Sequence, residues 1–183
     1  VFSNKMDKMG ADFAASVESI KARLGVKATA IQWPIGAESE FDGIIDLVTM
    51  KAYHYDGKPE ENAKEIEIPA DLKDLVEEKH AELIDAVAEF DDEMMETYLE
   101  GGEVTEEMIK RAIRKGCLAT KFFPVMCGDA LGNKGIKPLM DAVIDYLPSP
   151  LDIASIKGHN LKGEEETRHP SDSEPFSALA FKV

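Results

Sequence analysis

Asn4, Lys5 and Asp7 form an Asn-Lys-x-Asp pattern directly behind an apolar start, Val1-Phe2-Ser3. An aspartate carboxylate can accept hydrogen bonds from both the N1–H and the N2–H₂ groups of guanine, a pair of donors that adenine does not present. The stem of Lys5 can cover the flat face of such a base, and the amide of Asn4 can brace neighbouring loops. A pattern this short also occurs in ordinary solvated loops that follow a buried strand. The four residues alone therefore leave both interpretations open.

A second candidate loop lies in the other half of the chain. Residues 123–127 read as a short buried strand, and they run into the glycine-flanked loop 128–135 before a helical pattern begins. A loop of this kind at the carboxyl end of a strand can bring backbone N–H groups onto the edge of a ligand. Here that edge would be the O6 atom of guanine, which adenine lacks. The two loops together therefore predict a site for guanine.

The two motifs resemble the fourth and fifth motifs of a GTPase domain. Four longer stretches, 1–13, 34–50, 139–150 and 175–183, are similar to bacterial translation elongation factor G, and the resemblance covers essentially the whole chain. It implies an α/β fold, in which the C-terminal part of a P-loop GTPase sheet carries an α+β inserted subdomain and is followed by the first strand of a β domain. The family's activity is GTP hydrolysis on the ribosome, coupled to movement of messenger and transfer RNA.

The resemblance also implies a set of nucleotide-binding residues. Asp7 would read N1 and N2 of guanine, Lys5 would cover the base, and Asn4 would orient the loop. The backbone N–H of Ala130 would donate to O6. The implied set consists of Asn4, Lys5, Asp7, Asp129, Ala130 and Leu131.

Asp129 departs from the family's usual pattern, which has serine at this position. A second carboxylate aimed at the base would repel the carboxylate of Asp7. We therefore expect the side chain of Asp129 to point to solvent. The contact from the backbone N–H of Ala130 does not depend on that side chain.

The sequence contains no Gly-x-x-x-x-Gly-Lys-[Ser/Thr] phosphate loop and no Asp-x-x-Gly element for magnesium. We therefore expect a fragment, in which no residue is assigned to catalysis or to a metal ion. GTP or GDP, with magnesium, would be bound by the intact parent, and this chain alone is not expected to hydrolyse GTP. Two alternatives are a stand-alone protein-binding module that uses the insertion, and a related translational GTPase such as a ribosomal protection or release factor.

The negative charge of the chain is concentrated in one segment. Of the net charge of −15, residues 60–107 contribute −16, from 19 acidic and 3 basic side chains. Such a surface repels phosphate, so it disfavours nucleic-acid contact there and fits either solubility or a basic partner. The resemblance implies that this partner is the ribosome, through its stalk protein.

Other features of the sequence concern the setting of the chain. No apolar run approaches the roughly 20 residues of a membrane span, so no membrane contact is expected. Cys117 and Cys127 are isolated thiols near apolar segments, which favours the reducing cytoplasm and buried, unreactive side chains.

The spacing of the two motifs indicates an insertion between them. Asp7 and Gly128 are 121 positions apart, whereas one strand–helix–strand unit needs only about 30 residues. The predicted parts are the guanine-reading strand and helix (1–27), the inserted acidic subdomain (28–121), the last strand and helix of the GTPase domain (122–151), a linker (152–174) and the start of a second, β-barrel domain (175–183).

Periodicity predicts the elements inside these parts. Alternating or β-branched residues predict a small meander with strands over 27–35, 41–48, 51–55 and 64–68. Apolar residues at helical spacing predict helices over 13–24, 72–90, 94–99, from Thr105 onward and 138–147. A sheet that lacks its upstream strands would expose an edge, so non-native self-association is a further expectation.

Overall fold

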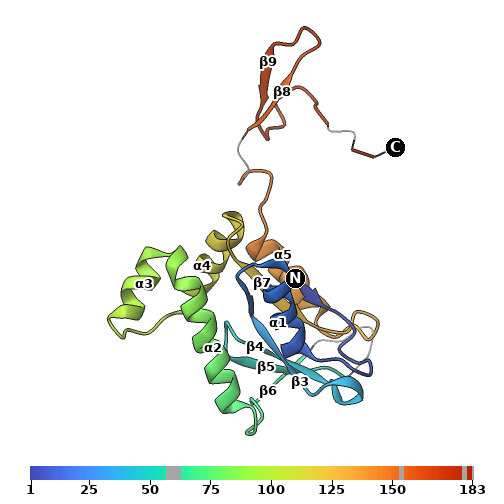
Figure 1. The fold of residues 1–183 in the computed structure, drawn as a ribbon, viewed down its shortest axis with the longest axis vertical. Helices are drawn as coiled ribbons and strands as arrows, with labels where there is room; N and C mark the ends of the chain where they lie inside the picture. Colours follow the sequence, from blue (N-terminus) through green and yellow to red (C-terminus); the bar gives the residue numbers. More distant parts are fainter. Residues whose placement is uncertain (57–62, 153–154, 179–180, 183) are drawn as a thin grey trace. The chain divides into compact units, whose positions relative to one another are not determined.

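The computed structural model describes residues 1–56, 63–152, 155–178 and 181–182. It has a mixed α/β architecture and divides into two units, Val1–Leu147 and Pro148–Val183 (Figure 1). The first unit contains both candidate loops. Each unit is described by itself below.

A three-stranded parallel sheet positions the two loops. Its strands are β1 (Phe2–Ser3), β7 (Phe123–Cys127) and β2 (Ala28–Ala30), in the order β1-β7-β2. Ser3 pairs with Cys127, so the strands end at the same level and the loops that follow leave the sheet side by side. The predicted strand over 123–127 is confirmed.

Helices α1 (Phe13–Leu24) and α5 (Ile136–Tyr146) follow the two loops along the chain. The side chain of Asp12 accepts a hydrogen bond from the N–H of Ala15 and caps the start of α1. Gly25 ends this helix in the left-handed conformation, with φ 63°. The predicted helix over 13–24 is therefore confirmed, and the structure adds the cap at Asp12.

An antiparallel meander forms a second sheet, and it corrects one sequence prediction. Its strands are β3 (Gln32–Ile35), β4 (Gly43–Asp46), β5 (Lys51–His54) and β6 (Lys64–Ile66), in that order. The single strand predicted over 27–35 is instead two strands, β2 and β3, in different sheets. Ile31 lies between them: its N–H donates to the carbonyl of Val125 and its own carbonyl accepts from Leu47, both at 3.0 Å. Ala28, expected to begin the insertion, thus lies in the parallel sheet.

Three α-helices and a 3₁₀ turn form a cluster that lies to the left of both sheets in Figure 1. They are α2 (Lys73–Val87), η2 (Ala88–Phe90), α3 (Asp92–Leu99) and α4 (Glu106–Leu118). The apolar stripe predicted for residues 72–90 is core, since Leu83 and Val87 are fully buried. The helix predicted from Thr105 onward is α4, and Thr105 caps it by accepting from the N–H of Met108.

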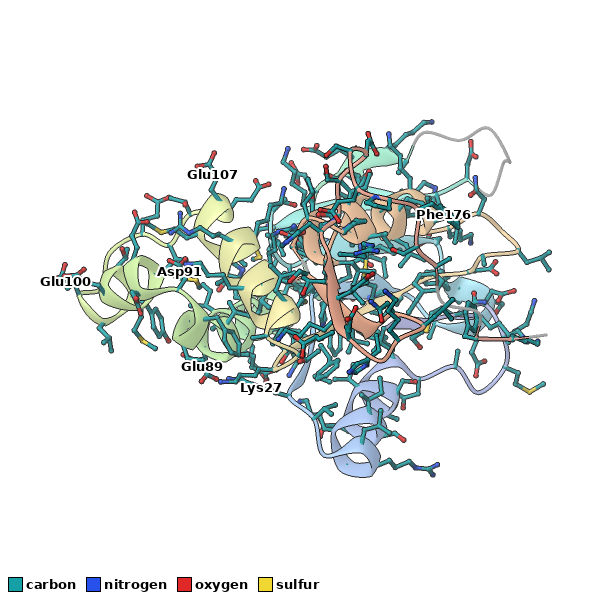
Figure 2. All side chains as sticks on the ribbon, turned by 90° about the horizontal axis from the view of Figure 1, so that it is seen from above. Lys27, Glu89, Asp91, Glu100, Glu107 and Phe176 are labelled. Carbon is teal, nitrogen blue, oxygen red and sulfur yellow. The ribbon has the colours of Figure 1, made fainter. Side chains whose placement is uncertain are left out.

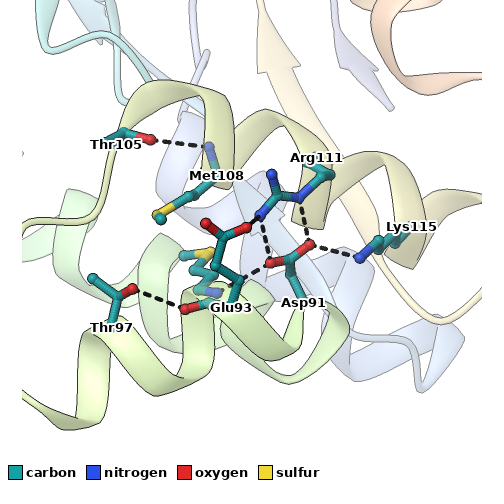
Figure 3. Close-up of polar contacts among 8 residues, drawn as sticks. Asp91, Glu93, Thr97, Thr105, Met108, Arg111 and Lys115 are labelled. Atoms are coloured by element: carbon teal, nitrogen blue, oxygen red, sulfur yellow. Dashed lines mark hydrogen bonds and ion pairs between the residues drawn. The ribbon is translucent and has the colours of Figure 1, made fainter.

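A buried carboxylate joins α3 to α4. Asp91 accepts hydrogen bonds from Arg111, from Lys115 and from the N–H of Met94, and Arg111 also bonds Glu93 (Figure 3). Because residues 111 and 115 lie on one face of α4, a single side chain fixes the start of α3 against that face.

The second unit differs from its prediction in two places. Residues 152–174 were expected to form only a linker, but they contain an antiparallel hairpin, β8 (Ile156–His159) with β9 (Glu165–Arg168). Its strands are mostly polar, with β8 exposed and β9 largely half-buried, so they lack the apolar alternation that reveals a strand. The strand predicted over 175–183 is absent from the described residues 175–178 and 181–182, where Phe176 and Phe181 are exposed. Alternation alone forms no strand without a neighbour to pair with. Residues 179, 180 and 183 lie outside the described part.

Within the described ranges, no helix combines the length and the apolar character needed to cross a membrane.

Candidate functional site

Asn4 links the two candidate loops. Its side-chain oxygen Oδ1 accepts a hydrogen bond from the backbone N–H of Ala130 at 2.9 Å and another from the N–H of Lys5 at 2.8 Å. The N–H of Met6 also donates to the carbonyl of Gly128 at 3.1 Å. Two loops that are more than 120 positions apart in the sequence thus meet at one place, beyond the carboxyl ends of neighbouring strands.

One carboxylate oxygen of Asp7 lacks a hydrogen-bond donor among the described residues. Its side chain is 22% exposed, and one carboxylate oxygen pairs with the ammonium group of Lys8. This hydrogen bond and the charge of Asp7 raise the pKa of Lys8. The other oxygen, Oδ1, is buried without a hydrogen-bond partner among the described residues. A buried acceptor in this state is unfavourable until a donor reaches it, and the N–H groups of a guanine would supply one.

Lys5 adopts a left-handed backbone conformation, with φ 65°, and its side chain is exposed. This conformation is uncommon for a residue with a Cβ atom. The amide of Asn4 stabilises it by accepting from the N–H of Lys5.

The expectation for Asp129 was wrong. Its side chain is 5% exposed and does not point to solvent. The carboxylate turns into its own loop, where Oδ1 accepts from the N–H of Leu131 at 3.1 Å and Oδ2 from the N–H of Gly132 at 3.0 Å. Aspartate often satisfies N–H groups two and three residues ahead in this way, and here the loop replaces water as the donor. Within the described residues, no hydrogen bond joins Asp129 to Asp7.

Two glycines allow the second loop to close. The loop is pinned by reciprocal backbone hydrogen bonds between Asp129 and Lys134, at 3.0 and 2.9 Å. A Cβ atom on Gly132 would lie 2.3 Å from the carboxylate of Asp129, and one on Gly128 would lie 2.5 Å from the carbonyl of Lys134. At Gly128 the obstacle is backbone, so a larger residue does not fit there. At Gly132 a larger residue would have to displace the carboxylate of Asp129 from its hydrogen bonds.

The N–H groups of this loop are already engaged. Leu131 donates to Asp129, and Ala130 donates to Asn4. Guanine O6 could therefore receive the N–H of Ala130 only if the side chain of Asn4 released it. As long as the carboxylate of Asp129 holds the N–H of Leu131, that group is not available to a ligand.

Sequence reasoning missed Glu38, which lies in the 3₁₀ turn η1 (Glu38–Glu40) between β3 and β4. Its N–H donates to the carbonyl of Met6 at 2.9 Å, and its carboxylate accepts from the N–H of Gly10 at 2.7 Å. The only signal nearby is Gly36, which suggests a tight turn without indicating what the turn contacts.

The acidic surface is partly neutralised by lysines. The carboxylates of Glu78 and Glu82 bond Lys79 at 3.1 and 2.7 Å. Glu89 pairs with Lys27, whereas Glu100 and Glu107 lie on the outer rim of the helical cluster (Figure 2). In the part of the chain that the structure describes, no group of three or more His, Cys, Asp or Glu side chains could hold a metal ion.

Comparisons with known proteins identify relatives of this chain. Residues 1–149 match the sequence model of the family described as elongation factor Tu GTP binding domain. The chain is 56% identical over all 183 residues to elongation factor G of Ureaplasma parvum serovar 3 (strain ATCC 27815) and of Ureaplasma urealyticum serovar 10. It spans 27% of the length of each of these relatives.

A solved structure shares the fold. A crystal structure of a protein from Thermus thermophilus superimposes with a TM-score of 0.72 and 30% sequence identity, covering 85% of this chain and 23% of that one. The family match extends over residues 1–149, which include both loops and the whole first unit. The chain therefore belongs to the family of elongation factor Tu GTP-binding domains.

Proposed function

We propose that this chain is the base-reading part of a translational GTPase of the elongation factor G type. The observation that carries the proposal is the hydrogen bond from Ala130 to Asn4, which joins the two loops. The first of these loops contains Asp7, whose carboxylate has an unpartnered oxygen. Asp7 would read N1 and N2, Lys5 would cover the base, and Ala130 would meet O6. In the parent protein, the ligand would be GTP or GDP with magnesium, and the activity would be GTP hydrolysis on the ribosome.

Base recognition alone binds weakly. Two charge-assisted hydrogen bonds to Asp7 are worth roughly 3–6 kcal/mol together, whereas association itself costs about 4–15 kcal/mol. We therefore expect this chain to bind guanine nucleotides only at millimolar concentrations or above. Detection of micromolar GTP binding by calorimetry would contradict that expectation.

The test is a substitution at Asp7 that should change the preferred base from guanine to xanthine. In Asp7→Asn, the side-chain oxygen can still accept from N1–H, but its amide now donates where the carboxylate accepted. Xanthine has a carbonyl oxygen at C2 in place of the guanine amino group, so this variant should prefer xanthosine monophosphate to GMP. NMR titrations of the ¹⁵N-labelled chain with GMP, xanthosine monophosphate and AMP would follow the amides of Lys5, Asp7 and Ala130.

A matched control is Asp71→Asn, which neutralises an exposed carboxylate just before α2. It should leave the GMP preference of the wild-type chain unchanged. If the wild-type chain responds equally to GMP and AMP, or if Asp7→Asn keeps the original preference for GMP, the base-reading role is wrong.

We also propose a division of the parts. The inserted subdomain would lie within residues 28–121, of which 28–30 form β2 of the parallel sheet. Residues 122–151 would complete the GTPase domain, and 175–183 would begin the second domain. The acidic face of the insertion would dock on the ribosomal stalk protein in the bacterial cytoplasm. Since Glu78, Glu82 and Glu89 already pair with lysines, charge reversal at Glu100 and Glu107 is the cleaner test. It should weaken stalk-dependent hydrolysis in the parent protein, and more so at low salt.

The edge of the parallel sheet supports the expected self-association. β1 has a neighbour only on its β7 side within the described ranges, so its other edge can pair with a second chain. Light scattering that finds a single monomeric species would contradict this. The alternative of a stand-alone binding module rests on the acidic face, and it predicts partner binding with no preference between GMP and AMP.

A further inference from the structure

One turn of the meander contacts both base-reading loops. We call residues 36–41, which lie in the connection from β3 to β4, the bracing turn. On the first loop, it bonds Met6 through the N–H of Glu38 and Gly10 through the carboxylate of Glu38. On the second loop, the ammonium group of Lys134 donates to the carbonyl of Phe41 and lies 5.5 Å from the centre of the Phe41 ring.

The bracing turn holds an unfavourable backbone conformation. Glu38 has φ 54° and Gly36 has φ 73°, and a Cβ atom at Gly36 would lie 2.0 Å from the carbonyl oxygen of Glu40. A left-handed conformation is disfavoured for glutamate, because its Cβ approaches the backbone, and it persists only where other contacts impose it. At Glu38 these contacts are the two hydrogen bonds to the first loop. The strain is therefore located at the residue that makes the bracing contacts.

The two contacts of Glu38 lie on either side of Asp7. Met6 is the residue before it, and Gly10 lies three residues after it. Met6 is itself buried, so the backbone on that side is anchored in the core. Fixing both sides of the segment limits the directions in which the carboxylate of Asp7 can point. A hydrogen bond to guanine needs such a direction to be set in advance.

We propose that Glu38 is a positioning residue for the base-reading site, and that the bracing turn couples this site to the meander. The proposal rests on the proposed function, because it assumes that Asp7 reads the base. Glu38 does not contact the base. It holds the loop in the form that binds, and Phe41 does the same for the second loop through Lys134.

The test separates positioning from stability with three substitutions. Glu38→Gly relieves the left-handed strain but removes the carboxylate, so it should raise or preserve the melting temperature and still weaken GMP binding. Glu38→Ala removes the same contact without relieving the strain. Glu38→Gln keeps a side-chain oxygen that can accept from Gly10, so it should retain most of the binding. Loss of one hydrogen bond should weaken GMP binding by about fivefold.

Two measurements on the ¹⁵N-labelled chain test the proposal, one with a nucleotide and one without. The first is the GMP titration, with AMP as the reference. The second needs no ligand: the amide of Gly10 should exchange its hydrogen faster in Glu38→Gly and Glu38→Ala, while amides in the middle of α1 stay protected.

The outcomes separate this proposal from the proposed function. If the wild-type chain does not prefer GMP to AMP, the base-reading function fails, and the exchange of Gly10 still tests the brace. If the wild-type chain prefers GMP and Glu38→Gly binds it equally well, Glu38 does not position the site. Unchanged exchange at Gly10, or equal losses in Glu38→Gln and Glu38→Ala, would also overturn the proposal.

Discussion

Asp91 offers a quantitative test of how α3 and α4 are held together. Its side chain is 1% exposed, and its two oxygens receive four hydrogen bonds of 2.6 to 3.0 Å: two from Arg111, one from Lys115 and one from the N–H of Met94. Two substitutions separate these contributions. Asp91→Asn retains an oxygen that can cap α3 but loses the charge, and Asp91→Ala loses both.

The expected magnitudes follow from the burial of each partner. Loss of the cap costs about 1 kcal/mol. The side chains of Arg111 and Lys115 are 42% and 52% exposed, so water can solvate both cations once Asp91 is neutral, and neither is left as a buried unpaired charge. After this discount for exposure, the ion pairs contribute about 1–3 kcal/mol, below the roughly 3–5 kcal/mol lost when one partner of a fully buried pair is removed. Asp91→Asn should therefore lower the free energy of unfolding by about 1–3 kcal/mol and Asp91→Ala by about 2–4.

The pH dependence has a definite sign. The hydrogen bonds from Arg111, then those from Lys115 and Met94, hold the pKa of Asp91 well below its usual range. Because the folded pKa lies below the unfolded value of about 3.9, the unfolded chain binds the extra proton. The stabilisation is therefore fully present above about pH 5 and is lost as the pH falls through about 4 and below. Asp91→Asn has no such proton to bind, so its deficit relative to the wild-type chain should shrink as the pH falls from about 7 to about 3.

Urea unfolding followed by far-UV circular dichroism at four pH values between about 7 and about 3 would measure both effects. Glu100→Gln is the control, since Glu100 lies on the exposed rim at the end of α3. A deficit for Asp91→Asn that is the same at neutral pH and at the acid end of the series would refute the assigned role of the Asp91 charge. A deficit at neutral pH no larger than that of Glu100→Gln would refute it as well.

Two further predictions concern the thiols and the turns. Burial raises the pKa of Cys117 to about 11 and also raises that of Cys127, so at about pH 8 only about one Cys117 thiol in a thousand is ionised. Iodoacetamide should therefore label neither cysteine in the folded chain but both in urea, as mass spectrometry would show, and rapid labelling of the native chain would contradict this. Gly25→Ala should lower the free energy of unfolding by about 1–2 kcal/mol. The loss comes from the left-handed backbone alone, with φ 63°, because a Cβ atom there would meet no neighbour. Gly36→Ala should lower the free energy of unfolding by at least about twice as much, because its Cβ would also clash with the carbonyl of Glu40. Equal urea midpoints for these two variants would show that the clash is relieved without cost.

The features that the sequence predicted well depend on neighbours along the chain. The helix over 13–24 and its end at Gly25 are local, as is the strand over 123–127. The meander was also predicted, but the first predicted strand, over 27–35, is two separate strands in the structure. The break at Ile31 depends on hydrogen bonds to Val125 and Leu47, which no local pattern reports.

The errors and omissions at the site have the same origin. Asp129 was expected in solvent on the basis of charge repulsion, but the N–H groups of its own loop satisfy its carboxylate away from solvent. Glu38 was missed because Gly10 lies 28 positions away in the sequence. The hairpin β8–β9 was missed because its mostly polar strands show no alternation of apolar residues.

The hydrogen bonds at the site also indicate which contact would discriminate the base. A guanine O6 that takes the N–H of Ala130 breaks the existing bond to Asn4, so one N–H···O bond replaces another with little net gain. At Asp7, Oδ1 has no bond to lose within the described residues, and a donor from the base removes an existing penalty of about 1–3 kcal/mol. Most of the preference for guanine over adenine should therefore come from Asp7. It follows that Asp7→Asn should change the base preference far more than any substitution in the loop 128–135 that leaves the fold intact.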